Sequence, residues 1–306
     1  MEGVELLETL CSIRAASGDE RKMKAFLLDH ILRNQDNWKN KPEIFYGDDF
    51  QDCIVLVFGC PRAAVFAHMD SIGFTARYKN QLVKIGAPHI QSGIILVGED
   101  RHGEIECELQ LDEDRTISCL FDREIDRGTN LTFMPDWRET EDAVQCCYMD
   151  NRLGVWTALE ICKTLEDGII VFSCWEEHGG GSVPYLAKFI HEKYQIRKAL
   201  ISDITWVTDG VPAGNGTVIS LRDSGLPRRS FVEQIIQLAK KSGAKFQLEV
   251  EGSGGSDGNE LQKQPYPIDW CFIGPPEENV HTPDEKVRKS DITENLKLYR
   301  YLMQKL

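Results

Sequence analysis

Five short segments carry histidine and carboxylate side chains in an order that suits a site for two metal ions. The candidate residues are His68 with Asp70, Asp150, Glu176 with Glu177, Asp203, and His281. Imidazole and carboxylate are ligands that Zn²⁺ and Co²⁺ accept, and two such ions can make a shared water nucleophilic at neutral pH. Together the segments predict metal-assisted hydrolysis of an amide bond, although each one alone has a plainer explanation.

His68 directly follows the apolar run 63–67, so we expect it at the carboxyl end of a central strand, where open α/β sheets place their ligands. Asp70 can accept the second imidazole proton and so hold His68 in the tautomer that binds metal. Taken alone, this motif is explained at least as well by a core histidine followed by a capping aspartate.

Glu176 and Glu177 follow the apolar run 169–174. Two carboxylates at the end of a buried strand are costly unless they bind something. One can ligate a metal while its neighbour, with a pKa raised by the shared environment, takes a proton from the bound water. The alternative is a solvated acidic loop.

The remaining candidates are weaker singly. Asp150 precedes an amphipathic helix, where a carboxylate is usually an N-cap, and the rival interpretation is a ligand that bridges two cations. Asp203 follows the strand 199–202 and could simply form a turn. His281 lies in a loop before the last helix, and His178 adjoins the acidic pair as a less favoured ligand. Only the set of segments favours a metal site.

The elements that must position these residues alternate between strands and helices. Helical spacing covers 4–34 on both sides of a turn, with Ser17 or Asp19 as the predicted cap of the second helix. Ser230 and Glu233 form a predicted capping box. The other predicted strands and helices are 53–58, 63–67, 153–165, 169–174, 183–194, 199–202, 230–241, 246–250, 269–273 and 291–305. This pattern predicts an α/β fold with a mostly parallel mixed sheet and helices on both faces.

Between residues 72 and 148 the sequence pattern changes. Short runs of strand-forming residues are separated by Gly, Asp and Asn, and no helical periodicity is present. This predicts a small all-β domain, barrel-like, inserted into the α/β domain. The predicted organisation is therefore a discontinuous catalytic domain, 1–71 and 149–306, with an inserted domain at 72–148.

Composition excludes some classes of function. The 306 residues carry 35 Lys and Arg against 49 Asp and Glu, a formal charge of −14, which argues against sequence-independent nucleic-acid binding. The apolar runs are too short to span a membrane, and no signal peptide is visible. Ten cysteines without a CxxC pair, several within apolar runs, indicate reduced thiols and a cytoplasmic location. Adjacent Cys146 and Cys147 are expected to pack in a strand.

The motifs resemble those of the glutamyl aminopeptidase and tetrahedral aminopeptidase family of metallopeptidases. The resemblance spans nearly the whole chain and keeps the order of the motifs. The segments that carry it are 67–74, 150–152, 176–177, 202–205 and 281–285, which read AHMDSIGF, DNR, EE, SDIT and HTPDE.

The resemblance implies a zinc-peptidase-like fold, peptide substrates with a free N-terminus, and two divalent ions, Zn²⁺ or Co²⁺. His68 and His281 are implied as terminal ligands of one ion each, and Asp150 as the bridge, with an unusual cis peptide to Asn151. Glu177 and Asp203 complete the two sites. Glu176 is implied as general base and acid, and Asp70 as the residue that orients His68. The resemblance also places the loop 254–257 near the substrate.

Some features depart from the family pattern: Ser71 replaces a glutamate, Asn151 an aspartate, and His178 a valine, and the inserted β region is short. These departures bear on substrate preference and on assembly, for which a homo-oligomer through the inserted domain is expected by analogy. The position of the insertion favours an aminopeptidase over a deacylase or carboxypeptidase on the same scaffold. A non-catalytic binding module is the alternative outside the enzymes.

Overall fold

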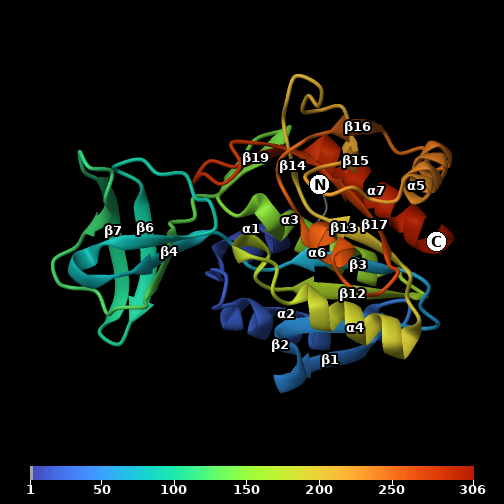
Figure 1. Ribbon diagram of the computed structural model, residues 1–306, viewed down its shortest axis with the longest axis horizontal. Helices are drawn as coiled ribbons and strands as arrows, with labels where there is room; N and C mark the ends of the chain where they lie inside the picture. The colour runs from blue at the N-terminus through green and yellow to red at the C-terminus, as the bar shows by residue number, and fades with distance from the viewer. Residues whose placement is uncertain (1–2) are drawn as a thin grey trace.

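The computed structural model describes residues 3–306, which form one large mixed sheet, two smaller sheets and helices packed against them (Figure 1). The large sheet has eight strands in the order β1-β2-β12-β3-β13-β17-β15-β16. Their bounds are Glu43–Gly47, Gln51–Phe58, Gly168–Ser173, Ala64–His68, Lys198–Ser202, Asp269–Gly274, Thr217–Arg222 and Phe246–Val250. The predicted mixed α/β architecture is confirmed.

The centre of this sheet is parallel: β12, β3, β13 and β17 run in one direction, whereas β1, β2 and the β17–β15 pair add antiparallel contacts. The central strands are fully buried along most of their length, as expected of continuous apolar runs covered on both faces. Ser173 pairs with His68 in register, so β12 and β3 end together at one edge of the sheet.

The helices form two groups. Helices α1, α3, α7 and α5 contact one another in succession, and α4 contacts α6, which Figure 1 shows in front of the sheet. Helix α2 packs on β2. The bounds of α1 to α7 are Val4–Ser12, Arg21–Asn34, Met149–Cys162, Val183–Tyr194, Arg229–Ser242, Asp257–Gln262 and Lys289–Lys305. Short 3₁₀ turns lie at Gln35–Asn37, Asp48–Phe50, Tyr78–Asn80 and Glu176–His178.

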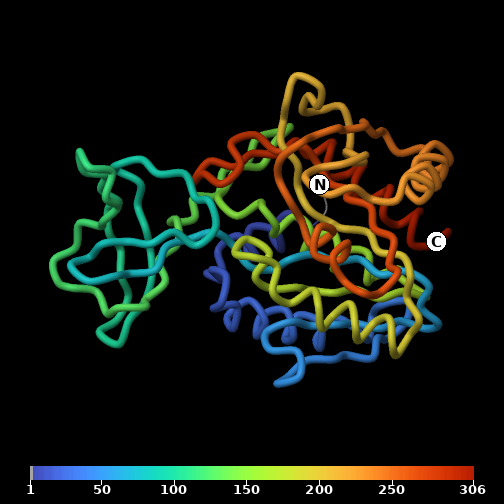
Figure 2. The backbone as a smooth tube through the Cα atoms, in the orientation of Figure 1, coloured from blue at the N-terminus to red at the C-terminus, as the bar shows by residue number. Residues whose placement is uncertain are grey.

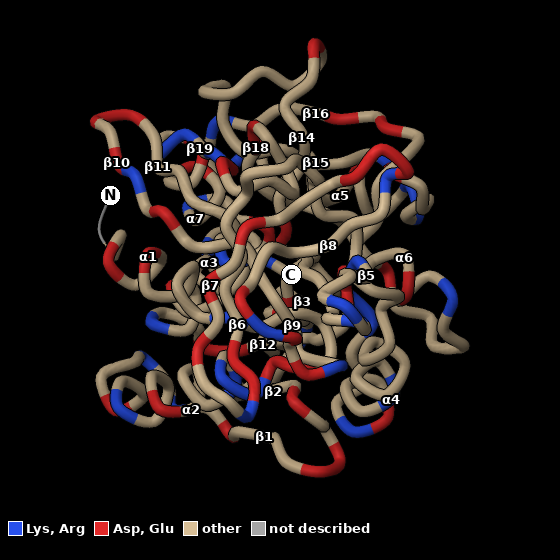
Figure 3. Tube along the Cα trace, turned by 90° about the vertical axis from the view of Figure 1, so that its left-hand side faces the viewer, with Lys and Arg blue, Asp and Glu red and all other residues tan. Residues whose placement is uncertain are grey.

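A separate antiparallel sheet of six strands, in the order β5-β4-β9-β6-β7-β8, stands to one side of the molecule (Figure 2). Strands β4 to β9 are Gly73–Ala76, Leu82–Ile85, Ile95–Asp100, Gly103–Leu111, Ile117–Leu120 and Asn130–Phe133. Seen from this side, acidic and basic positions are interspersed along the trace (Figure 3).

The third sheet has five strands in the order β10-β11-β19-β18-β14 and joins distant parts of the chain. The bounds are Arg138–Glu139, Ala143–Gln145, Lys286–Arg288, Pro276–Glu278 and Thr205–Trp206. The strand expected to contain Cys146 and Cys147 ends at Gln145, before both residues, so that prediction is wrong. This strand, β11, pairs with β19 of the C-terminal region rather than with the six-stranded sheet. Cys146 and Cys147 lie buried just beyond it.

Two predicted helix caps are wrong. Helix α2 has Glu20 at its N-cap position without a side-chain cap, because the Ser17 hydroxyl donates to Asp70 instead. Helix α5 begins after Arg228, also without a side-chain cap, and Glu233 pairs with Arg229. Helix α5 stops before Gly243, which takes a left-handed φ of 71° that glycine adopts readily. Within residues 3–306, no helix combines the length and apolarity needed to cross a membrane.

Candidate active site

Three candidate segments meet at one edge of the large sheet because their strands are adjacent and parallel. His68 is the last residue of β3, Asp203 directly follows β13, and Glu176 begins the 3₁₀ turn that follows β12. Carboxyl ends of parallel strands lie on the same edge, which is where such sheets bind ligands. The strand order thus gathers groups that are far apart in the sequence.

Asp150 reaches the same edge from the first turn of α3. Its φ and ψ of −77° and 102° are not helical, and its peptide bond to Asn151 is cis, as the family resemblance implied. Asn151 Nδ2 donates to the carbonyl of Ser202 at 2.8 Å, which ties this turn to the end of β13. The carboxylate of Asp150 is held beside the sheet edge rather than used as a helix cap.

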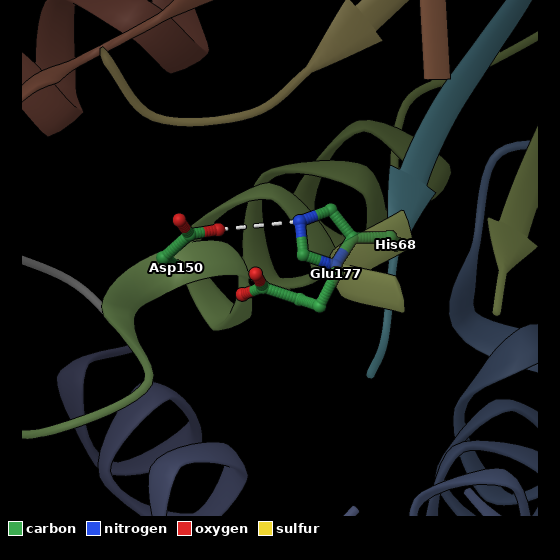
Figure 4. Close-up of side chains that lie close together, drawn as sticks. All are labelled: His68, Asp150 and Glu177. Carbon is green, nitrogen blue, oxygen red and sulfur yellow. Dashed lines mark hydrogen bonds and ion pairs between the residues drawn. The ribbon is translucent and has the colours of Figure 1, made fainter. Parts of the chain in front are cut away.

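Asp150 stands between the two histidines. Its Oδ1 lies 3.2 Å from His68 Nε2, and its Oδ2 lies 3.3 Å from His281 Nε2. Asp203 Oδ1 is 3.6 Å from His68 Nε2, whereas Glu177 Oε2 is 3.2 Å from His281 Nε2. Figure 4 shows His68, Asp150 and Glu177 converging. The five side chains therefore divide into two halves that share Asp150.

This arrangement fits divalent cations. One ligand atom each from His68, Asp150 and Glu177 lies within 4.8 Å of the others, and the buried Glu177 Oε1 has no hydrogen-bond partner among the described residues. Burial lowers the pKa of His281, but hydrogen bonds to Asp150 and Glu177 outweigh it and raise the pKa to about 12. Carboxylates that hold an imidazole protonated so strongly form a site that demands positive charge.

His68 shows the same balance. Burial lowers its pKa, yet the surrounding carboxylates, Asp203 first, hold the pKa of His68 well above its ordinary value. Conversely, the two imidazoles overcome burial and keep the pKa of Asp150 below its usual range. Metal ions and imidazole protons compete for the same electron pairs, so cation binding at this site is expected to release protons.

Glu176 lies at the rim of the candidate site. Its Oε2 is 3.9 Å from His68 Nε2, and its side chain retains 17% of its exposure. Burial raises the pKa of Glu176 well above its ordinary value. The imidazole of His68 lowers this pKa, whereas the negative charges of Asp203 and Glu177 raise it further. A carboxylate of raised pKa that opens toward a cavity is suited to accept a proton from water.

Asp70 contacts His68 and also the turn that bears the two glutamates. Its Oδ1 lies 3.4 Å from His68 Nδ1 and accepts the Glu176 N–H at 3.1 Å. Its Oδ2 accepts from Glu177 N at 3.2 Å and from Ser17 Oγ at 2.6 Å. Because Asp70 is fully buried, these contacts position the imidazole and both glutamates together.

Sequence reasoning assigned no role to two buried residues that support the site. Glu285 accepts the N–H of His281 at 2.9 Å and that of Asp150 at 3.3 Å. The Arg152 guanidinium donates to main-chain carbonyls, including that of Asp70 at 3.2 Å. Both residues stood inside quoted motifs, Glu285 in HTPDE and Arg152 in DNR, but their contacts depend on the tertiary structure.

His178 and the loop 254–257 lie near the candidate site and make different contacts. His178 is exposed, and its Nδ1 accepts the Gly86 N–H at 3.1 Å instead of facing the paired ligands. In the loop 254–257 the Ser256 hydroxyl caps α6, and the buried Asp257 accepts from Ser173. Gly254 and Gly255 line the pocket described below.

The site opens into a pocket of about 630 Å³. Its acidic lining residues are Asp150, Glu176, Glu177, Asp203, Asp223, Glu249 and Glu251. Gly86 and Ala87, which follow β5 of the six-stranded sheet, also line the pocket. Residues next to the six-stranded sheet and residues next to the large sheet therefore both contribute to its wall.

Comparison with known proteins agrees with this architecture. A family model described as M42 glutamyl aminopeptidase matches residues 113–298, well over half of the chain. The chain belongs to the M42 glutamyl aminopeptidase family. This membership makes the protein a peptidase, a class of hydrolase, and supports aminopeptidase activity. The resemblance seen in the sequence motifs is thereby confirmed.

Individual relatives cover the chain almost end to end. A protein of Acetivibrio thermocellus named as an aminopeptidase is 24% identical over 96% of both chains. The TET aminopeptidase structure from a marine sediment archaeon of the Thaumarchaeota superposes with a TM-score of 0.87 at 16% identity, covering 100% of this chain and 98% of the other. The Pyrococcus horikoshii TET1 peptidase gives a TM-score of 0.81 at 19% identity over 99% of both chains. The structural likenesses show the shared fold.

Proposed function

We propose that this M42 family member is a dinuclear metal-dependent aminopeptidase that removes N-terminal residues from peptides with a free N-terminus. The observation that carries the proposal is the position of Asp150, whose two carboxylate oxygens lie 3.2 and 3.3 Å from the Nε2 atoms of His68 and His281. A carboxylate placed in this way suits a bridge between two cations.

The proposed ligands follow the two halves of the site. His68 and Asp203 would hold one ion, His281 and Glu177 the other, and Asp150 both, a set of donors suited to Zn²⁺ or Co²⁺. Bound there, the two ions would supply Lewis-acid polarisation of the scissile carbonyl and a water molecule acidified toward neutral pH.

The chain's own residues would move the protons. Glu176 accepts a proton from the attacking water and returns it to the leaving amine, which its raised pKa and its place beside the pocket support. Asp70 keeps His68 oriented and holds the Glu176 backbone in place. The acidic pocket wall favours a substrate with a protonated amine, consistent with exopeptidase action at a free N-terminus.

The proposal extends to the organisation of the chain. We infer a discontinuous catalytic domain at 1–71 and 149–306 and an inserted β domain at 72–148, supported by the separate six-stranded sheet. The pairing of β11 with β19 ties the last part of the insertion to the catalytic domain. The Pyrococcus horikoshii TET1 peptidase can assemble into a tetrahedron or an octahedral shell, which supports a homo-oligomer here. Light scattering of the purified protein tests this assembly.

The activity is tested on metal-stripped protein supplied with Zn²⁺ or Co²⁺ and a panel of free and N-acetylated peptides. Metal-dependent release of N-terminal residues from free peptides alone is expected. Hydrolysis restricted to acetylated peptides would favour a deacylase, and two bound ions without any hydrolysis would favour a binding module.

The role of Glu176 is tested by Glu176→Gln. This variant should retain two ions by metal analysis but lose about 10²–10⁴-fold in kcat, the usual contribution of a positioned general base. Glu8→Gln is a matched control, because Glu8 is exposed and lies on α1 away from the pocket. Full activity of the Glu176→Gln variant would rule out the assigned role.

A further inference from the structure

We propose that the pocket selects substrates whose N-terminal residue has a basic side chain, lysine or arginine. This inference rests on the proposed aminopeptidase function and adds a substrate class to it. It comes from three acidic residues of the pocket, Asp223, Glu249 and Glu251, which lie outside the candidate metal site.

Apart from histidine, the charged side chains that line the pocket are acidic. Seven acidic side chains line it, and no Lys or Arg occurs among the described residues of its wall. Two divalent ions would balance the charges of the three carboxylate ligands and of Glu176. The charges of Asp223, Glu249 and Glu251 would then remain, so an acidic substrate side chain would be repelled and a basic one attracted.

The three acids adjoin the Asp203 half of the site. Glu249 lies on β16 and accepts a hydrogen bond from Thr205, two residues beyond Asp203. Asp223 directly follows β15, the neighbour of β16 in the sheet, and interacts electrostatically with Asp203. Figure 1 shows β14, β15 and β16 beside one another at the top of the molecule. The acids therefore form one wall of the same pocket.

Two of these carboxylates are buried without a cationic partner. Asp223 is 8% exposed and Glu249 is 3% exposed, and neither forms an ion pair within the described part of the chain. Their hydrogen bonds come from neutral groups, the Gly225 N–H and the Thr205 hydroxyl. Burial of an unpaired carboxylate is costly, so a ligand cation would relieve this cost.

A further polar group beside Glu249 lacks a partner. Ser220 pairs with Glu249 in register on the adjacent strand β15 and is 2% exposed. Its hydroxyl forms no hydrogen bond of normal length among the described residues, although it lies near enough to Glu249 to lower the pKa of that carboxyl. Buried hydroxyls normally form hydrogen bonds. The ammonium or guanidinium group of a basic substrate side chain bound at Glu249 would change the hydrogen bonds around Glu249 and Ser220.

The rest of the wall suits the stem of a basic side chain. Phe272 and Ile204 are buried apolar lining residues, and Trp206 is 37% exposed at the pocket. Lysine and arginine carry an aliphatic stem that packs on apolar surface, and their charged groups interact favourably with indole rings. The neighbouring Arg222 donates to the Asp223 carbonyl and lowers the pKa of the Asp223 carboxyl, which favours its charged form, but Arg222 is not part of the pocket lining.

The test compares fluorogenic amides of lysine and norleucine, which have stems of equal length and differ in the terminal ammonium. With Zn²⁺- or Co²⁺-loaded protein, kcat/KM for lysine should exceed that for norleucine by about tenfold or more, as one charge-assisted contact allows. The glutamate amide should be the poorest of the three. Equal values for lysine and norleucine, or a preference for glutamate, would overturn the inference.

Substitutions of the acidic pocket residues test whether they cause the preference for lysine. Glu249→Gln and Glu251→Gln should each lower the lysine-to-norleucine ratio several-fold, and Glu251 is only partly buried, so its substitution tests the idea even if Glu249→Gln fails to fold. Glu8→Gln, remote from the pocket, should leave the ratio unchanged. A lysine preference that persists in full in both pocket variants would contradict the assignment.

A binding measurement separates this inference from the proposed function. Calorimetry with lysinol and norleucinol, which have no amide bond to hydrolyse, on the metal-loaded protein reports on the pocket without turnover. Tighter lysinol binding in a protein that hydrolyses no peptide would support the basic pocket and refute the aminopeptidase. Hydrolysis of free peptides with equal binding of both amino alcohols would do the reverse.

Discussion

Substitution of Asp70 by asparagine tests how the site orients its ligands. The carboxylate accepts three hydrogen bonds, from the N–H of Glu176 at 3.1 Å on one oxygen and from Glu177 N–H and Ser17 on the other, and its first oxygen lies 3.4 Å from His68 Nδ1. Asparagine keeps one acceptor oxygen and replaces the other with an NH₂ donor. Two donors must then face that NH₂ group in a fully buried position.

The expected result is weaker metal binding. If the asparagine oxygen serves Ser17 and Glu177, its NH₂ group faces His68 and favours the tautomer protonated on Nε2, the nitrogen that points at Asp150. Loss of such a supporting carboxylate typically costs about 10–100-fold in metal affinity or activity, or roughly 1.4–2.7 kcal/mol. We therefore expect Asp70→Asn to lower both the affinity for one ion and kcat/KM within that range.

The assay is competition for Zn²⁺ against a chromophoric chelator, with the absorption spectrum of the Co²⁺ form as a second readout. Asp291→Asn is a matched control, because Asp291 is also fully buried and accepts two N–H groups, from Gly214 and Gly216, away from the site. The control should lower the free energy of unfolding while keeping metal affinity. Wild-type metal affinity and kcat/KM in Asp70→Asn would refute the reasoning.

Three further predictions concern protonation, ligation and thiol access. Burial, aided by the charge of Asp70, raises the pKa of Glu20 from 4.5 to about 7, so the folded state holds a proton that the unfolded state releases. The free energy of unfolding of the metal-free protein should therefore fall as the pH rises from 4.5 through 7, by at most about 3 kcal/mol from this group. Urea unfolding at pH 5 and pH 8 measures this fall, which should be smaller in Glu20→Gln than in the wild type. The same fall in both proteins would contradict the assignment. His178→Ala should still bind two ions, because His178 contacts Gly86 and not the paired ligands; loss of one ion in metal analysis would make it a ligand. Of the ten cysteines only Cys60 is exposed, so a thiol reagent should modify one group rapidly in the native protein, and several fast thiols would contradict the packing.

Local pattern predicted the elements that carry the site. The apolar runs before His68 and Asp203 form β3 and β13, and the predicted limits of α4 and β16 agree with the structure. Such runs are informative because a central parallel strand must be apolar on both faces. The placement of His68, Glu176 and Asp203 at strand ends followed from chain order alone, and the sheet order brings those ends together.

Interactions between distant residues could not be predicted in this way. Ser17 has the chemistry of a helix cap, but its hydroxyl serves Asp70, since a buried carboxylate gains more from that bond. Glu285 stands in the quoted HTPDE motif, but only its contacts with the backbones of Asp150 and His281 show that it supports two candidate ligands at once.

The sequence by itself determined the family, the mixed α/β architecture, and the inventory of histidines and carboxylates available for the candidate site. These depend on residue type, order and short-range periodicity, which the chain carries in any conformation. Only the tertiary structure decided which carboxylate faces which imidazole, and which acids remain to line the pocket. Asp223, Glu249 and Glu251 lie on segments that meet through strand pairing, so their shared wall exists only once the sheet has formed.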